Sequence, residues 1–99
     1  MTTKYEAKRY LCDVAPEQCF WVNNGPILKS IDDLSNELPN MSDETYRHHV
    51  CNGNNDFSKW VNNIIGDKKL ANDLLSSKTK DSAMKKLNSR LAVLKKKSG

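Results

Sequence analysis

The sequence predicts a mostly helical α+β domain in which one N-terminal β-hairpin packs on about five short α-helices. Two observations predict this fold. Short apolar runs flank the turn-forming segment Asn23-Asn24-Gly25-Pro26, which is typical of a hairpin. From Ser30 onward, apolar residues recur every three or four positions, and this is the period of an amphipathic helix.

The first 18 residues are expected to form an arm or a short strand. The segment from Tyr5 to Val14 is consistent with either, and Pro16 interrupts it. The hairpin is predicted over residues 19–29. Because Pro26 has no N–H group to close a two-residue turn, we expect a looser loop of about four residues.

Two short helices are predicted next. Ser30 is a suitable N-cap with Asp33 at the capping-box position, and Pro39 ends this first helix. Its apolar stripe consists of Ile31, Leu34 and Leu38. Ser42 caps the second helix, which the polar run Asn52-Gly53-Asn54-Asn55 ends. Its inward-facing residues are predicted to be Tyr46, His49 and Val50, with His48 in solvent.

Three further helices complete the predicted chain. Asn55 or Asp56 caps one that ends at Gly66, Asp67 caps the next, and Thr79 or Lys80 opens the last. Their apolar stripes are Phe57, Trp60, Val61, Ile64 and Ile65; then Leu70, Ala71, Leu74 and Leu75; then Ala83, Met84, Leu87, Leu91 and Leu94. The predicted core includes Phe20, Val22, Leu34, Leu38, Phe57, Trp60, Val61, Ile64, Leu70 and Leu74.

Length and charge indicate one domain with an uneven charge distribution. A chain of 99 residues supports a single domain with one core. Within this domain we expect a core module over residues 19–77 and a basic C-terminal helix over residues 78–99. Residues 78–99 carry eight Lys and Arg against one acid, whereas residues 1–77 carry eight basic and eleven acidic residues. A basic segment of this kind suits an acidic partner, although cations also stabilise a helix C-terminus.

Candidate groups for chemistry are few. The cysteines Cys12, Cys19 and Cys51 are separated by six and thirty-one residues, which does not match the spacing of zinc ligands. No metal is therefore expected, and the alternative that these cysteines and His48 together hold zinc stays open. The chain contains no P-loop, no G-x-G-x-x-G and no H-E-x-x-H motif, so no cofactor, no catalytic residue and no enzymatic activity are expected.

Several short motifs along the chain form a pattern. They are Phe20-Trp21-Val22, Gly25, Leu28, Ile31, Asp33-Leu34, Leu38, Met41–Tyr46, His49-Val50, Asn55–Val61, Ile65–Asp67 and Leu70-Ala71. Together they resemble a small domain family of archaea and bacteria whose function is unknown, over about residues 19–75. The resemblance implies no activity, cofactor or catalytic residue. The cysteines and the basic helix after Lys78 are not part of the pattern.

The sequence thus favours a non-catalytic interaction module with a protein partner. The alternative is a small nucleic-acid-binding protein that uses its last helix. The candidate phosphate contacts are Lys85, Lys86, Arg90, Lys95, Lys96 and Lys97, with Lys86, Arg90 and Lys97 expected near one outer face. With no apolar run of about 18 residues and no apolar signal-peptide segment, a cytoplasmic protein without a membrane partner is expected.

Overall fold

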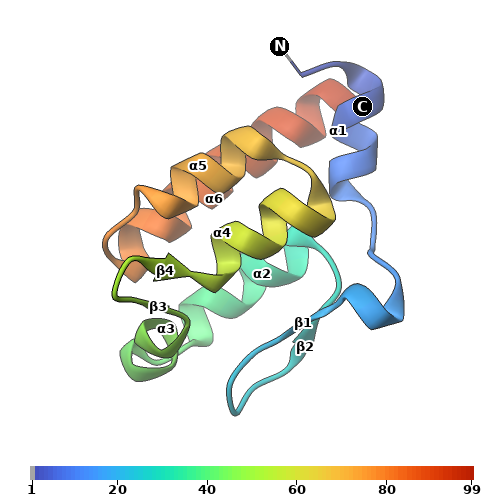
Figure 1. The fold of residues 1–99 in the computed structure, drawn as a ribbon. Helices are drawn as coiled ribbons and strands as arrows, with labels where there is room; N and C mark the ends of the chain where they lie inside the picture. Colours follow the sequence, from blue (N-terminus) through green and yellow to red (C-terminus); the bar gives the residue numbers. More distant parts are fainter. Residues whose placement is uncertain (1) are drawn as a thin grey trace.

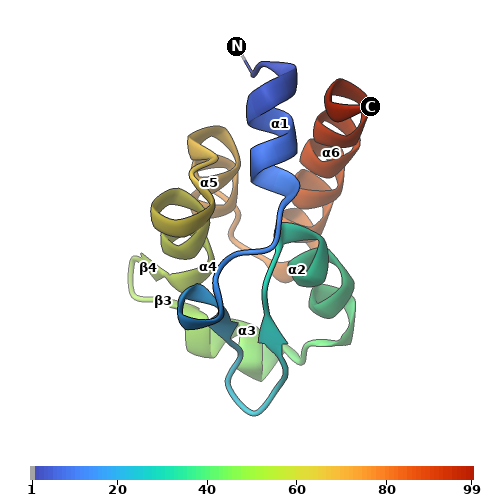
Figure 2. The same cartoon turned by 90° about the vertical axis from the view of Figure 1, so that its right-hand side faces the viewer.

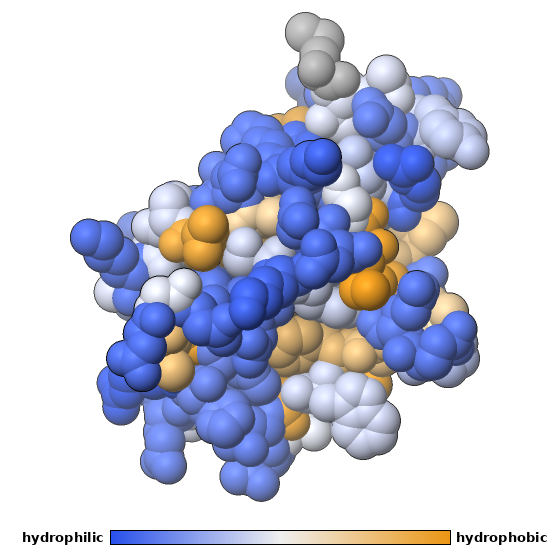
Figure 3. Space-filling model, viewed as in Figure 1, coloured by the Kyte–Doolittle hydropathy of each residue, from blue (hydrophilic) through white to orange (hydrophobic). Residues whose placement is uncertain are grey.

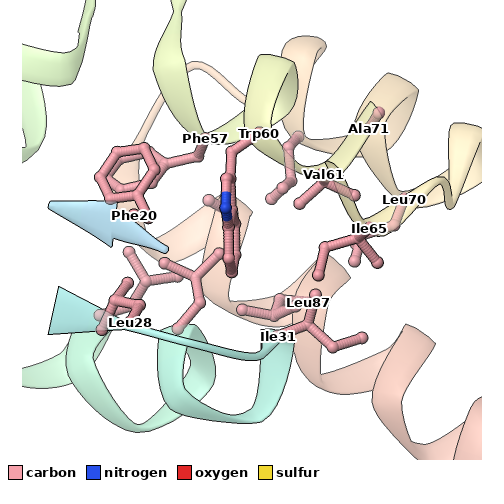
Figure 4. Close-up of a cluster of buried hydrophobic side chains, with 14 of the residues drawn as sticks. Phe20, Leu28, Ile31, Phe57, Trp60, Val61, Ile65, Leu70, Ala71 and Leu87 are labelled. Carbon is pink, nitrogen blue, oxygen red and sulfur yellow. The ribbon is translucent and has the colours of Figure 1, made fainter. Parts of the chain in front are cut away.

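The computed structural model describes residues 2–99 and confirms the mostly helical α+β fold (Figure 1). In this range the chain forms six α-helices and two short hairpins. The longest helix is α6, Lys80–Ser98, which Thr79 caps through its side chain. Buried apolar side chains from α1 through α6 form one core cluster (Figure 4). The basic C-terminal helix is therefore part of the core.

The prediction of an arm or strand for residues 1–18 is wrong over most of its length, because Lys4–Leu11 form helix α1. A complete capping box starts it: the Thr3 hydroxyl accepts from the Glu6 N–H, and the Glu6 carboxylate accepts from the Thr3 N–H. Ala7 and Tyr10 are buried on the inner side of α1. This helix lies against α6, so the two ends of the chain meet (Figure 2).

The hairpin predicted over residues 19–29 is confirmed. Strands β1, Phe20–Trp21, and β2, Ile27–Leu28, pair antiparallel with Phe20 opposite Leu28 and Trp21 opposite Ile27. The expected loose loop is present, because the Val22 N–H donates to the Pro26 carbonyl at 3.2 Å, and Pro26 has no N–H to return the bond. The left-handed residue in this loop is Asn24.

Helices α2, Ile31–Glu37, and α3, Asp43–His49, begin at the predicted caps Ser30 and Ser42. A 3₁₀ turn that contains Pro39 follows α2. After α3 the chain forms a second hairpin that the sequence analysis did not predict, with strands β3, Val50–Cys51, and β4, Asn54–Asn55. Asn52 and Gly53 have φ of 50° and 78°, the positive values that a two-residue hairpin turn needs.

Helix α4, Asp56–Trp60, continues into a π-helical turn, Val61–Ile65, and ends at left-handed Gly66. Asp67 caps α5, Lys68–Leu75, at once. The predicted core residues are buried except Ile64, which is partly buried, and the prediction that Leu75 is inward is wrong because its side chain is exposed. No helix within residues 2–99 is long and apolar enough to cross a membrane.

Candidate functional site

The six basic residues predicted on α6 do not form one surface. Lys85 and Lys96 are exposed, and among the described residues their ammonium groups have no hydrogen-bond partner. Lys95 pairs with Asp32 of α2 at 3.1 Å. Lys86 donates to the Ser76 hydroxyl and Lys97 to the Thr2 carbonyl. The candidates therefore point toward different neighbours around the helix.

Arg90 is buried, and its predicted place on the outer face is wrong. Its guanidinium donates two hydrogen bonds to the Asp67 carboxylate, from Nε at 2.8 Å and from Nη2 at 3.0 Å, and Nη2 also donates to the Thr2 hydroxyl. Asp67 is only 1% exposed and also caps α5 by accepting from the Leu70 N–H. Arg90 thus satisfies a buried carboxylate, a role that hydrophobic periodicity does not reveal.

A basic groove runs between α1, α5 and α6. It consists of two adjoining hollows of about 600 and 320 Å³ that share Lys69 and Arg90. Its cationic residues are Arg9, Lys68, Lys69, Lys85, Lys86, Arg90 and Lys97. The sequence analysis missed Arg9 because it did not predict α1. Lys68 and Lys69 were not predicted because residues 1–77 carry more acidic than basic residues; one of these acids, Asp67, is neutralised inside the protein by Arg90.

The first hairpin exposes an apolar pair. Trp21 is 71% exposed and Ile27, opposite it across the strands, is 50% exposed. Hydrophilic side chains cover most of the face drawn in Figure 3, where apolar residues appear in small separate groups. The next residues along each strand, Phe20 and Leu28, point inward. A strand alternates its side chains between two faces, so the burial of Phe20 forces Trp21 outward.

The hairpin is held in place by aromatic and polar contacts. The Phe20 ring stacks on Phe57 at 4.9 Å between centroids and contacts Trp60 edge-on at 5.8 Å. The Trp60 indole N–H donates to the Gln18 carbonyl at 2.8 Å, just before β1. His49 accepts at Nε2 from the Asn23 N–H at 3.0 Å, in the hairpin loop. These contacts fix the position of Trp21.

His49 is buried and its two ring nitrogens are both engaged, as predicted for an inward-facing residue with a backbone partner. Nδ1 lies 3.0 Å from Asp56 Oδ2. Because Nε2 accepts from Asn23, the neutral ring with its proton on Nδ1 satisfies both neighbours. His48 is exposed. His49 therefore connects α3 to the hairpin loop and to the start of α4.

The same contact affects the acid Asp56. Partial burial disfavours its charged form, but hydrogen bonds from His49 and Asn54 and the charge of Lys59 outweigh this effect and lower the pKa of Asp56 below its ordinary value. Folding thus favours the carboxylate. This contribution to stability is present above the pKa of the unfolded carboxyl and is lost as the pH falls through the lower folded pKa.

We expect Asp56→Asn to remove part of the acid sensitivity of the fold. Urea unfolding should show the wild type more stable than the variant near neutral pH, with the difference shrinking as the pH falls below the ordinary range of an Asp carboxyl. The effect should be modest because the Asp56 side chain is 40% exposed. Glu44→Gln, on exposed Glu44, is the control. A stability difference that grows at low pH would contradict this assignment.

The three cysteines are separate in the structure. Cys12 and Cys51 are exposed and Cys19 is half-buried, and all three are free thiols. Among residues 2–99, no group of three or more His, Cys, Asp and Glu side chains is arranged to hold a metal ion. The possible zinc ligands of the sequence are not brought together.

Comparison with protein-family models, with curated proteins and with solved structures found no match to this chain.

Proposed function

We propose that this protein is a non-catalytic interaction module whose first hairpin binds a protein partner through Trp21 and Ile27. The observation that carries this proposal is the 71% exposure of Trp21 on a rigidly anchored hairpin. Tryptophan is among the residues most enriched at the centres of protein interfaces, where its large apolar surface is desolvated. An exposed tryptophan beside an exposed isoleucine offers such a centre.

The anchoring of the hairpin supports this proposal. A binding surface that is ordered before the partner arrives loses less conformational entropy on association than a mobile loop does. Phe20, buried against Phe57 and Trp60, holds the strand, and His49 holds the loop through Asn23. The partner that suits this surface is a protein with an apolar pocket deep enough for an indole ring.

We expect Trp21→Ala to abolish partner binding while leaving the fold intact. The free energy of unfolding should change by no more than about 0.5 kcal/mol, as for an exposed side chain. The partner is first isolated on the immobilised protein and then purified. Calorimetric titration should show that Trp21→Ala lowers the affinity for this partner about thirtyfold or more. In the wild type, binding should protect the exposed Trp21 from acrylamide quenching, whereas Trp60 is already buried.

Tyr5→Ala is the matched control. Tyr5 is 76% exposed but lies on α1, away from the hairpin (Figure 2). A partner whose affinity falls with Tyr5→Ala and not with Trp21→Ala would contradict the proposed surface. The other possible occupant of this surface is a second copy of the chain, and sedimentation equilibrium would detect it as a homodimer. A homodimer dispersed by Trp21→Ala would show that the surface serves self-association instead.

A further inference from the structure

The basic groove between α1, α5 and α6 has no role in the proposed hairpin interface. In Figure 2, α1 lies between α5 and α6 at the end of the molecule opposite the hairpin. We propose that this groove binds the phosphate backbone of a nucleic acid without regard to base sequence. The proposal rests on the placement of the cations, on the pairing of two of the three acids beside them, and on the absence of an exposed aromatic ring from the described lining.

The acids in the groove offset its cations only in part. Its three acidic residues are Glu6, Asp67 and Asp73. Asp67 is buried under Arg90, and Asp73 pairs with Lys69 at 2.9 Å. The Glu6 carboxylate accepts from the Thr3 N–H in the cap of α1. Hydrogen bonds from Thr3 and the charge of Arg9 lower the pKa of Glu6, so this acid keeps its negative charge. Seven cations against three acids still leave the groove with a net charge of +4.

Five cations of the groove form no ion pair within the part of the chain that the structure describes. They are Arg9, Lys68, Lys85, Lys86 and Lys97. The neutral Ser76 hydroxyl holds Lys86 and the neutral Thr2 carbonyl holds Lys97, so both side chains are positioned without loss of charge. The Arg9 guanidinium lies 5.3 Å from the centre of the Tyr10 ring, and a cation–π contact of this kind orients it.

The distribution of these cations suits a polymer of phosphates better than one small anion. They come from three helices and line two adjoining hollows, so a single phosphate would contact only a few of them. A nucleic acid presents phosphates at regular intervals, and each contact with Lys or Arg releases counterions. Phosphate contacts supply affinity and position but carry no base information.

The described lining also predicts that binding is independent of sequence. Its one aromatic residue is Tyr10, whose ring is buried between α1 and the rest of the protein. Base stacking needs an exposed aromatic surface, and base reading needs side chains that reach into a DNA groove. The described lining has neither an exposed aromatic ring nor an Asn or Gln side chain, so its Lys and Arg side chains are left to contact phosphates. Lys95 and Lys96, predicted earlier as phosphate contacts, lie outside it.

The test compares two triple variants of equal charge. The groove variant carries Lys68→Gln, Lys85→Gln and Lys86→Gln. The control variant carries Lys29→Gln, Lys95→Gln and Lys96→Gln at exposed positions outside the groove. Binding of a labelled mixed-sequence DNA duplex is measured by fluorescence anisotropy at about 50 mM and about 200 mM salt. Thermal unfolding of each variant shows that the fold is retained.

We expect the groove variant to bind about tenfold or more weakly at low salt, with the control close to the wild type. The slope of log affinity against log salt should flatten by about 0.9 for each lost phosphate contact. A variant with arginine at the same three positions should bind with the affinity and the salt slope of the wild type. A duplex of a second sequence should give the same affinities as the first for every variant. The proposal would be overturned if both variants bound equally weakly, or if the wild type did not bind the duplex at low salt. A preference for one sequence that survives in the groove variant would also overturn it. None of these outcomes depends on Trp21.

Discussion

Replacing Trp60 with alanine is expected to lower the free energy of unfolding by about 3–5 kcal/mol, the cost of truncating a large buried aromatic residue. Trp60 is 7% exposed, and its ring contacts Phe20 edge-on. Figure 4 shows its indole between β1, α4 and the buried side chains that reach toward it from α2 and α6. The substitution also removes the donor to the Gln18 carbonyl and would detach the segment that leads into the hairpin.

Urea unfolding of Trp60→Ala, Trp60→Phe and Trp21→Ala would measure this effect. Trp60→Phe keeps a ring in the core but lacks the N–H donor, so its loss of stability should be intermediate. Trp21→Ala removes the same side chain from an exposed position and serves as the control. An unchanged unfolding midpoint for Trp60→Ala would refute the central position of this ring in the core.

Replacing Arg90 with methionine is expected to destabilise the fold by about 3–5 kcal/mol, because it leaves the Asp67 carboxylate buried without its charged partner. Asp67 is 1% exposed, so water does not replace the two lost hydrogen bonds. Lys85→Met, an exposed position on the same helix, should change stability by less than about 0.5 kcal/mol. Chemical unfolding of both variants gives the comparison.

A double variant tests whether the charge itself is responsible. Asp67→Asn removes the carboxylate but keeps an oxygen that can accept from the Leu70 N–H and cap α5. Combined with Arg90→Met, it should recover a large part of the lost stability, so the two changes together should cost less than the sum of the single changes. Strict additivity would show that Arg90 acts independently of Asp67.

The starts of helices α2 to α6 were predictable because local chemistry sets them. Ser30, Ser42, Asn55, Asp67 and Thr79 all cap the helices that follow them by accepting from a backbone N–H three residues later. An apolar stripe behind each cap then gives the face that packs inward. Cap and stripe lie within a few residues of each other, so neither needs tertiary information.

The turns and the first helix show where local reading was insufficient. Two Asn-Gly pairs occur, and the tight two-residue turn forms at Asn52-Gly53, whereas Pro26 prevents it at Asn24-Gly25. Apolar runs flank the first pair on both sides, whereas the strand after Asn52-Gly53 is Asn54–Asn55, which carries no apolar signal. Helix α1 does begin with a local signal, the capping box of Thr3 and Glu6, which was overlooked in favour of an arm or strand. Its packing on α6, some eighty positions away, is the part that no local pattern contains.

The candidate surfaces were predictable only in part. The predicted core contained Phe20, Val22 and Trp60 but not Trp21, and the burial of these residues agrees with it. The contacts from α3 and α4 that anchor the hairpin join distant segments and were not predictable. Likewise, the net charge around α5 depends on which acids Arg90 and Lys69 neutralise, and this pairing joins segments distant in sequence.

The central position of α6 has a consequence for how the protein is made. Leu87 and Leu94 have no exposed surface, so the core against which α1 and α2 pack is complete only after α6 has been synthesised. A ribosome releases the N-terminal residues first, long before α6 exists. We therefore expect the nascent chain to stay unfolded until α6 has left the ribosome, with its apolar helix faces open to chaperones. A product shortened by a premature stop codon before α6 should be degraded rather than persist as a smaller domain.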